Sequence, residues 1–257
     1  MTARPPAPAL RLKGGLGGVD AELVAQLATG LGSMNGAFSA LAPEQAAEAY
    51  GVKVGGLSQM LMECTGFSLV AQGIFSAKTL AGSSIQEAVA WALVPETVYF
   101  VQLVLQGRAA KINMNKSGHF VVIAINLFLA HACFTGADHA DTALKVWLAW
   151  GAINVVAFIA APEPALKAWG LSSFTATDVV FMRSHGWNVG GLLAAQASQI
   201  LWGNSPSTAV GHAFLVMAAS VLDGLFISKG PEKLGVPVGA LYAWLGISCG
   251  VAAFTLL

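Results

Sequence analysis

The chain contains eight apolar segments, each about as long as a helix that crosses a lipid bilayer. A helix needs about 20 mostly apolar residues to cross the hydrocarbon core. Backbone polar groups in lipid must be satisfied within their own segment, so helices are expected. The sequence therefore predicts an all-α integral membrane protein with about eight transmembrane helices. The segments are approximately residues 21–41, 54–76, 85–106, 117–136, 141–161, 174–202, 208–228 and 236–257.

The composition fits a lipid environment and excludes some classes of partner. Of the 257 residues, 56% are hydrophobic and 10% are charged, whereas a soluble domain carries about 25% charged residues. The 13 basic and 13 acidic residues balance, so no basic stripe for nucleic acid is present in the sequence. Three widely spaced cysteines in apolar runs indicate neither a disulfide framework nor a zinc site. We expect them to be small buried side chains.

Residues 1–20 precede the first apolar segment and are rich in Pro and Gly. They contain three basic residues and no acidic residue before Asp20. Because no apolar core is present, the stretch does not have the pattern of a secretory signal. The tail of a transit peptide is one interpretation. We favour a surface arm that lies on the membrane.

The two halves of the chain share short motifs in the same order. "LAPEQAAEAYGV" at 41–52 matches "AAPEPALKAWGL" at 160–171, and "MECTGF" at 62–67 matches "MRSHGW" at 182–187. Several matches at nearly one offset indicate a tandem duplication. The expected repeats are residues 21–138 and 139–257, with four helices each. Since four is an even number, both repeats would begin on the same side of the membrane, as parallel repeats.

The shared Pro-Glu motif has its own structural meaning. Pro in the first turn and Gly after the last turn are typical of a short helix. Tyr50 and Trp169 near its end suit a membrane interface. Each repeat is therefore expected to have a short interfacial helix after its first membrane helix. The stretches "LQGRAAKINMNKSG" and "SKGPEKLG" are predicted to be loops.

Four charged residues inside the apolar segments are candidates for buried structural charges. Such a charge costs a few kcal/mol on insertion scales, so it should face the bundle or a partner. These residues are Glu63, Glu96, Arg183 and Asp223. Pro95 predicts a kink next to Glu96, and Glu96 is a candidate for lining a cavity.

Arg183 has two candidate partners. Glu63 occupies the equivalent position of the first repeat, so the two side chains would lie at equal depth. Asp223 belongs to the next helix of the same repeat, and its counterpart in the first repeat is Gln102. We favour the Arg183–Asp223 pair, with Glu63 and Gln102 as a hydrogen-bonded couple.

Four histidines within the apolar segments are candidate pigment ligands: His119, His131, His185 and His212. A chlorophyll needs one axial base and an apolar slot. The simpler interpretation is that these side chains make hydrogen bonds within the bundle. The antenna pattern Glu-x-x-His/Asn-x-Arg is absent from the sequence. No phosphate-binding loop, metalloprotease motif or nucleophile elbow is present either, so no enzyme activity is predicted.

The second repeat resembles a known group of membrane families. A membrane helix is followed by "APE…A…WGL", by "MRSHGWNVGGLLAAQ" and by a helix that ends in "LDG". This order over residues 145–257 resembles the DoxX-like four-helix membrane families. The first repeat follows it only loosely, because Glu63 replaces the Arg and Gln102 replaces the Asp. The resemblance implies a four-helix bundle in each repeat and no particular activity.

These features predict a non-catalytic accessory or scaffold subunit of a larger membrane complex. Other membrane subunits and lipids are its expected partners. The most specific version is a photosynthetic pigment–protein complex, such as a photosystem of the thylakoid membrane, with chlorophyll and carotenoid as cofactors. The alternative is a small transporter or channel that uses the buried Glu, Arg and Asp. A membrane redox enzyme would rest on the histidines alone.

Overall fold

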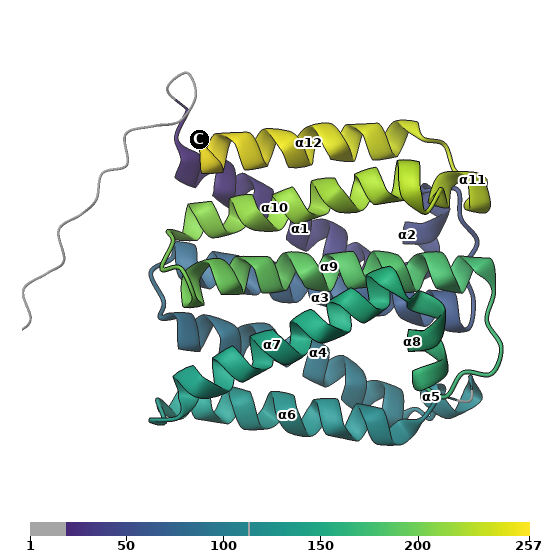
Figure 1. The fold of residues 1–257 in the computed structure, drawn as a ribbon, viewed down its shortest axis with the longest axis horizontal. Helices are drawn as coiled ribbons and strands as arrows, with labels where there is room; N and C mark the ends of the chain where they lie inside the picture. Colours follow the sequence, from purple (N-terminus) through teal and green to yellow (C-terminus); the bar gives the residue numbers. More distant parts are fainter. Residues whose placement is uncertain (1–18, 113) are drawn as a thin grey trace, which may run out of the picture.

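Within the described residues, every regular element of the protein is a helix (Figure 1). The computed structural model describes residues 19–112 and 114–257. Apart from its last two residues, the expected surface arm lies outside this range. Eight of the helices are long: α1 (Ala21–Leu41), α3 (Leu57–Leu80), α4 (Ile85–Leu105), α6 (Lys116–Thr135), α7 (Ala140–Ala160), α9 (Ala176–Ile200), α10 (Pro206–Leu222) and α12 (Gly239–Leu256). Each coincides with one of the apolar segments of the sequence.

Four short helices and one π-helical turn complete the described fold. They are α2 (Pro43–Ala49), α5 (Arg108–Lys111), α8 (Pro162–Ala168), η2 (Asp223–Ile227) and α11 (Gly230–Leu234). The short helices α2 and α8 are the two that the Pro-Glu motifs predict, and each has its proline in the first turn. The four short helices lie at one end of the bundle, on the right in Figure 1.

The prediction of two loops was wrong, because each contains a short helix. Gly107 with φ of 65° precedes α5, and Lys229 with φ of 50° precedes α11. Both residues have the left-handed conformation that lets the chain turn sharply before a new helix. Ala109 and Pro231 are buried. Packing against the bundle therefore stabilises these short helices. The local composition of the two segments does not reveal this packing, so the sequence predicted loops.

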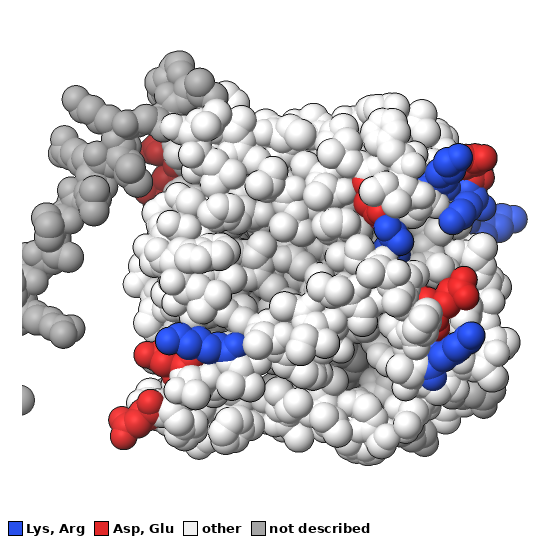
Figure 2. Space-filling view, in the orientation of Figure 1, with Lys and Arg blue, Asp and Glu red and all other residues white. Residues whose placement is uncertain are grey.

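In the part of the chain that the structure describes, six helices are long and apolar enough to cross a membrane. They are α3, α4, α6 from Ser117, α7, α10 together with η2, and α12. These six helices are compatible with an integral membrane protein. Figure 2 agrees, because most charged side chains of the visible face lie toward its two ends, and one acid–base pair lies farther in, right of the centre.

Helices α3 and α9 pack against each other at the centre of the bundle. On one side of this pair, α1 and α4 flank α3, and α6 packs against α4. On the other side, α7 and α10 flank α9, and α12 packs against α10. Much of the surface of α9 is therefore enclosed, including Gln196 and Ser198. This enclosure explains why α9 can be more polar than its neighbours, since its polar side chains do not face lipid.

Candidate functional site

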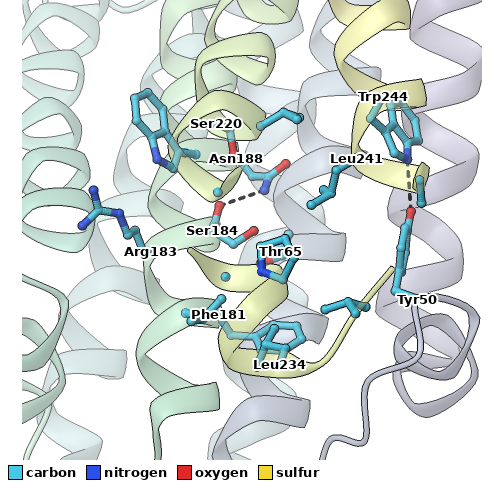
Figure 3. A pocket seen from close by; sticks show the side chains of 18 of the residues that line it. Tyr50, Thr65, Phe181, Arg183, Ser184, Asn188, Ser220, Leu234, Leu241 and Trp244 are labelled. Atoms are coloured by element: carbon cyan, nitrogen blue, oxygen red, sulfur yellow. Dashed lines mark hydrogen bonds between the residues drawn. The ribbon is translucent and has the colours of Figure 1, made fainter. Parts of the chain in front are cut away.

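The main cavity has a volume of about 270 Å³ and lies at the end of the bundle that holds α2 and α11. Side chains from α1, α2, α3, α9, α10, η2, α11 and α12 enclose it (Figure 3). Most of its wall is apolar, with Met62 and Leu69 from α3, Phe181 from α9, Met217 from α10 and Leu241 from α12. The cavity therefore draws on both halves of the chain.

Neutral polar groups line one wall of the cavity. Ser184 and Asn188 come from α9 and Ser220 from α10, and the three lie together in Figure 3. Asn188 Nδ2 donates to the backbone oxygen of Ser184 at 2.8 Å. This bond orients the amide and leaves its side-chain oxygen as an acceptor. Ser248 also lines the cavity, and its hydroxyl is fully buried without a hydrogen-bond partner.

A short hydrogen-bonded chain closes the opposite wall. Trp244 Nε1 on α12 donates to the hydroxyl of Tyr50 at 3.2 Å. The Tyr50 hydroxyl donates to Asn35 Oδ1 on α1 at 3.4 Å. Tyr50 directly follows α2, so the chain connects α12, α2 and α1. Figure 3 shows Tyr50 and Trp244 pointing toward each other across from Ser184 and Asn188.

An ion pair between Arg183 on α9 and Asp223 at the start of η2 belongs to the cavity lining on the side of Ser184 and Asn188. Arg183 Nε donates to Asp223 Oδ2 at 2.6 Å, and a second guanidinium nitrogen donates to Oδ1 at 2.5 Å. Trp187 Nε1 donates to Oδ2 at 3.1 Å. The prediction that Arg183 pairs with Asp223 is confirmed. Among the residues that line the cavity, these two are the only charged ones, so the pair leaves the wall electrically neutral.

Glu63 has a different partner from both that the sequence indicates. A guanidinium nitrogen of Arg108 on α5 donates to Glu63 Oε1 at 2.8 Å. This hydrogen bond raises the pKa of Arg108 above its ordinary value. The predictions of a Glu63–Arg183 pair and of a Glu63–Gln102 couple were therefore wrong, and Gln102 is exposed. Sequence reasoning missed Arg108 because α5 was read as a loop.

Glu96 lies outside the wall of the main cavity. Helix α4 continues through Pro95, and Glu96 Oε1 accepts a hydrogen bond from the Ser68 hydroxyl at 3.2 Å. Its side chain is half-buried between α3 and α4. Of the four candidate structural charges, Glu63 and Asp223 are buried, whereas Arg183 and Glu96 are half-buried.

The four candidate histidines are spread over three helices. His119 and His131 belong to α6, His185 to α9 and His212 to α10. None of them lines the main cavity. Within the described residues, no group of three or more His, Cys, Asp or Glu side chains could hold a metal ion.

The surroundings of these histidines differ. Nδ1 of His119 lies 3.2 Å from the backbone oxygen of Asn115, and Nδ1 of His212 lies 2.9 Å from the Ser198 hydroxyl. Hydrogen bonding within the bundle therefore accounts for two of the four. His185 is buried with Nδ1 unpartnered, and His131 is exposed on α6.

The expectation for the cysteines holds only in part. Cys64 and Cys133 are buried, but Cys249 on α12 is exposed. Helix α12 forms one edge of the bundle, so an apolar side chain there faces outward and is not enclosed by the protein.

The cavity itself was not predicted. Among its polar residues, Ser39 and Ser220 are single small side chains within apolar segments. Ser184 and Asn188 belong to the stretch "MRSHGWNVGGLLAAQ", which we interpreted for Arg183 and not as part of a cavity wall. Asn35 and Asn188 could have been identified from the sequence as candidate site residues, because an amide side chain inside a membrane helix needs a hydrogen-bond partner. The convergence of eight elements could not be derived from local patterns.

Comparisons with known proteins assign no family to the chain. No family model matches the chain, and searches of curated proteins and of solved structures find no match. The fold and site thus define a helical bundle with apolar outer surfaces and a cavity at one end of the bundle. The resemblance to the DoxX-like families stays a prediction.

Proposed function

We propose that the protein is a non-catalytic accessory subunit of a larger membrane assembly and that it holds a small, mostly apolar molecule in its cavity. The cavity is the observation that carries this proposal. Ligand sites are typically concave and apolar, with a few placed polar groups. A cavity of about 150 Å³ with apolar walls can hold benzene. At about 270 Å³, this cavity has room for a larger molecule.

The outer surface supports the assignment to a membrane assembly. Large apolar side chains are exposed along α4, α6, α7 and α12, and such surfaces suit lipid or the apolar faces of other subunits. Examples are Trp91, Phe120, Phe128, Ile153 and Ile247. Lipids and membrane subunits are thus the proposed partners.

We further propose that α1 and α9 also cross the membrane, giving eight spans in two tandem repeats, residues 21–138 and 139–257. In each half, the order of helices is long, short, long, long, short, long. Ser84 and Ser205 cap the third long helix of each half in the same way. The DoxX-like resemblance belongs to this proposal, since Arg183 on the second helix pairs with Asp223 at the end of the third.

A photosynthetic complex of the thylakoid membrane, with chlorophyll and carotenoid, remains the most specific version of the proposal. His131 is the histidine best placed for a pigment, because it is exposed on a helix that can span the membrane. Replacing His131 with Leu would remove the axial base and should reduce bound chlorophyll. Full pigment content in that variant would exclude His131 as a ligand.

The first experiment is gentle extraction of the protein from its own membrane. Native mass and an absorption spectrum are then measured, and mass spectrometry identifies the small molecules that remain bound. We expect a particle larger than the chain itself with a small apolar molecule attached, coloured if pigments are present. A particle of one chain without any bound molecule would contradict the proposal.

A small transporter or channel is the second candidate function. The Arg183–Asp223 pair on the cavity wall favours it, because an ion pair at a cavity can exchange partners with a polar solute. Uptake of a panel of small solutes into liposomes tests it. A transporter should lose uptake when Asp223 is replaced by Asn, with Glu96→Gln as a comparison outside the cavity wall. Uptake that neither variant changes would rule out transport through these charges.

A further inference from the structure

Two positions that line the cavity, Ser39 and Ser220, differ in residue type from the equivalent position in the other half of the chain. Ser84 and Ser205 are the N-caps of α4 and α10, and Tyr99 and Ser220 follow these caps by the same number of residues. Pro43 and Pro162 begin α2 and α8, and Phe158 precedes its proline by as many residues as Ser39 does. Ser220 is therefore the counterpart of Tyr99, and Ser39 is the counterpart of Phe158.

At the positions of Tyr99 and Phe158, aromatic rings of the protein fill the space. Tyr99 is 2% exposed and stacks on Phe67 with ring centres 4.8 Å apart. Its hydroxyl donates to the backbone oxygen of Met60 at 3.0 Å. Phe158 is also buried and meets Trp169 edge to face at 5.5 Å. Tyr99 and Phe158 belong to one continuous apolar cluster.

At the equivalent positions of Ser220 and Ser39, the protein leaves the space open. Ser39 and Ser220 both line the main cavity. So do Val180 and Ser184, which occupy the places of Met60 and Cys64 in the matching stretch of α9. The cavity thus lies where two rings are missing. Its volume of about 270 Å³ is nearly twice the roughly 150 Å³ of a cavity that holds one benzene ring.

We propose that this cavity binds an uncharged molecule that has a planar ring and at least one hydroxyl or carbonyl group. This inference rests on the proposed ligand-holding function and specifies its ligand. The ring of the ligand takes the place of the aromatic side chains that Tyr99 and Phe158 supply at the equivalent positions. The ligand carries no net charge, because Arg183 and Asp223 neutralise each other and no other charged side chain lines the wall.

The polar group of the ligand follows from the unpaired polar atoms of the wall. The Asn188 side-chain oxygen accepts from a ligand hydroxyl, and the hydroxyl of Ser220 donates to a carbonyl. A purely aliphatic chain would satisfy none of these groups.

Binding is measured on the full chain in lipid nanodiscs by equilibrium dialysis against labelled para-propylphenol, with empty nanodiscs subtracted. The comparison probe is n-nonanol, which has the same number of non-hydrogen atoms and one hydroxyl but no ring. We expect saturable binding of para-propylphenol that an equal concentration of n-nonanol does not displace. Equally tight binding of n-nonanol would overturn the inference that the ligand has a planar ring. The proposed function as a subunit that holds a small molecule would remain.

A variant that restores the missing rings tests the location. Ser39→Phe combined with Ser220→Tyr should abolish binding of para-propylphenol and leave the ligand-free unfolding temperature unchanged or higher, because the cavity is filled. Leu215→Tyr places a tyrosine on the exposed face of the same helix and should bind as the wild type does. Wild-type binding by the filled variant would overturn the assignment to this cavity.

A second variant covers the case in which the filled variant does not fold. Asn188→Leu keeps the side-chain size and removes the acceptor, so affinity for para-propylphenol should fall about tenfold, as expected for one lost hydrogen bond. Unchanged affinity would overturn the role of the polar wall. If neither probe binds and the native protein carries no small molecule, the proposed function fails together with this inference.

Discussion

Single residues decide whether the apolar interior tolerates charge, and the Arg183–Asp223 pair gives the clearest case. Asp223 is 4% exposed and accepts three hydrogen bonds from two side chains. Replacing Asp223 with Asn leaves a guanidinium without its counter-charge, so stability should fall by about 3 kcal/mol. Thermal unfolding in detergent measures the change.

Two further variants separate charge from packing at this site. Arg183→Met combined with Asp223→Leu removes both charges and should recover most of the stability, because an apolar pair needs no compensation. Lys78→Met breaks the more exposed Lys78–Glu87 pair and should change stability little. A double variant as unstable as Asp223→Asn would show that hydrogen bonding or shape, not charge, dominates.

Tyr99 tests the difference between the two halves at the same scale. Tyr99→Ser gives the first half the residue that the second half has, and it should open a cavity there. Removal of a buried aromatic side chain lowers stability by about 3–5 kcal/mol. Tyr242→Ser is the matched control, since Tyr242 is 53% exposed on α12. An equal loss of stability in both variants, measured by unfolding in detergent, would mean that Tyr99 fills no essential space.

At the scale of helices, α1 and α3 approach each other through glycines. A Cβ atom on Gly66 would collide with the backbone of Gly36 and Ala40 on α1. Small residues at such crossings let membrane helices pack closely. Gly66→Ala should therefore push α1 away from α3 and lower stability by about 1–3 kcal/mol.

Gly30 provides a control on the same helix pair. A Cβ atom there meets nothing within 4 Å. Gly30→Ala should thus leave stability unchanged or raise it by up to about 1 kcal/mol, because alanine favours helix more than glycine does. The two variants are compared by their midpoints of thermal unfolding. A loss at Gly30 as large as at Gly66 would argue against a specific close contact.

The positions of the long helices were predictable from the sequence, whereas some side-chain partners, such as Arg108 for Glu63, were not. Apolar length alone placed the eight long helices, since lipid leaves few alternatives to helix. The Arg183–Asp223 pair followed from one costly charge and one nearby acid. Arg108 escaped prediction because its helix has four residues and depends on tertiary packing. The cavity escaped for a related reason, because its wall comes from elements at both ends of the sequence.

At the scale of the whole molecule, the number of helices that cross the membrane determines on which side of the membrane each short helix lies. Six helices pass by length and hydropathy, whereas α1 and α9 are long but more polar. If all eight long helices cross, α5, α8 and α11 lie on one side of the membrane. If α1 and α9 do not cross, α11 lies on the side opposite to α5 and α8. The first arrangement is the one proposed above. Its basis is that the short helices of the described residues lie at one end of the bundle (Figure 1).

Single cysteines introduced at exposed positions distinguish these arrangements. We expect Lys111→Cys, Lys167→Cys and Lys233→Cys to react with a membrane-impermeant maleimide from the same side of sealed vesicles, and Asp138→Cys from the other side. A background in which Cys64, Cys133 and Cys249 are replaced by Ala keeps the signal specific. Labelling of Lys233→Cys from the side of Asp138→Cys would instead establish six spans and exclude parallel repeats, because the two halves would then have opposite orientations.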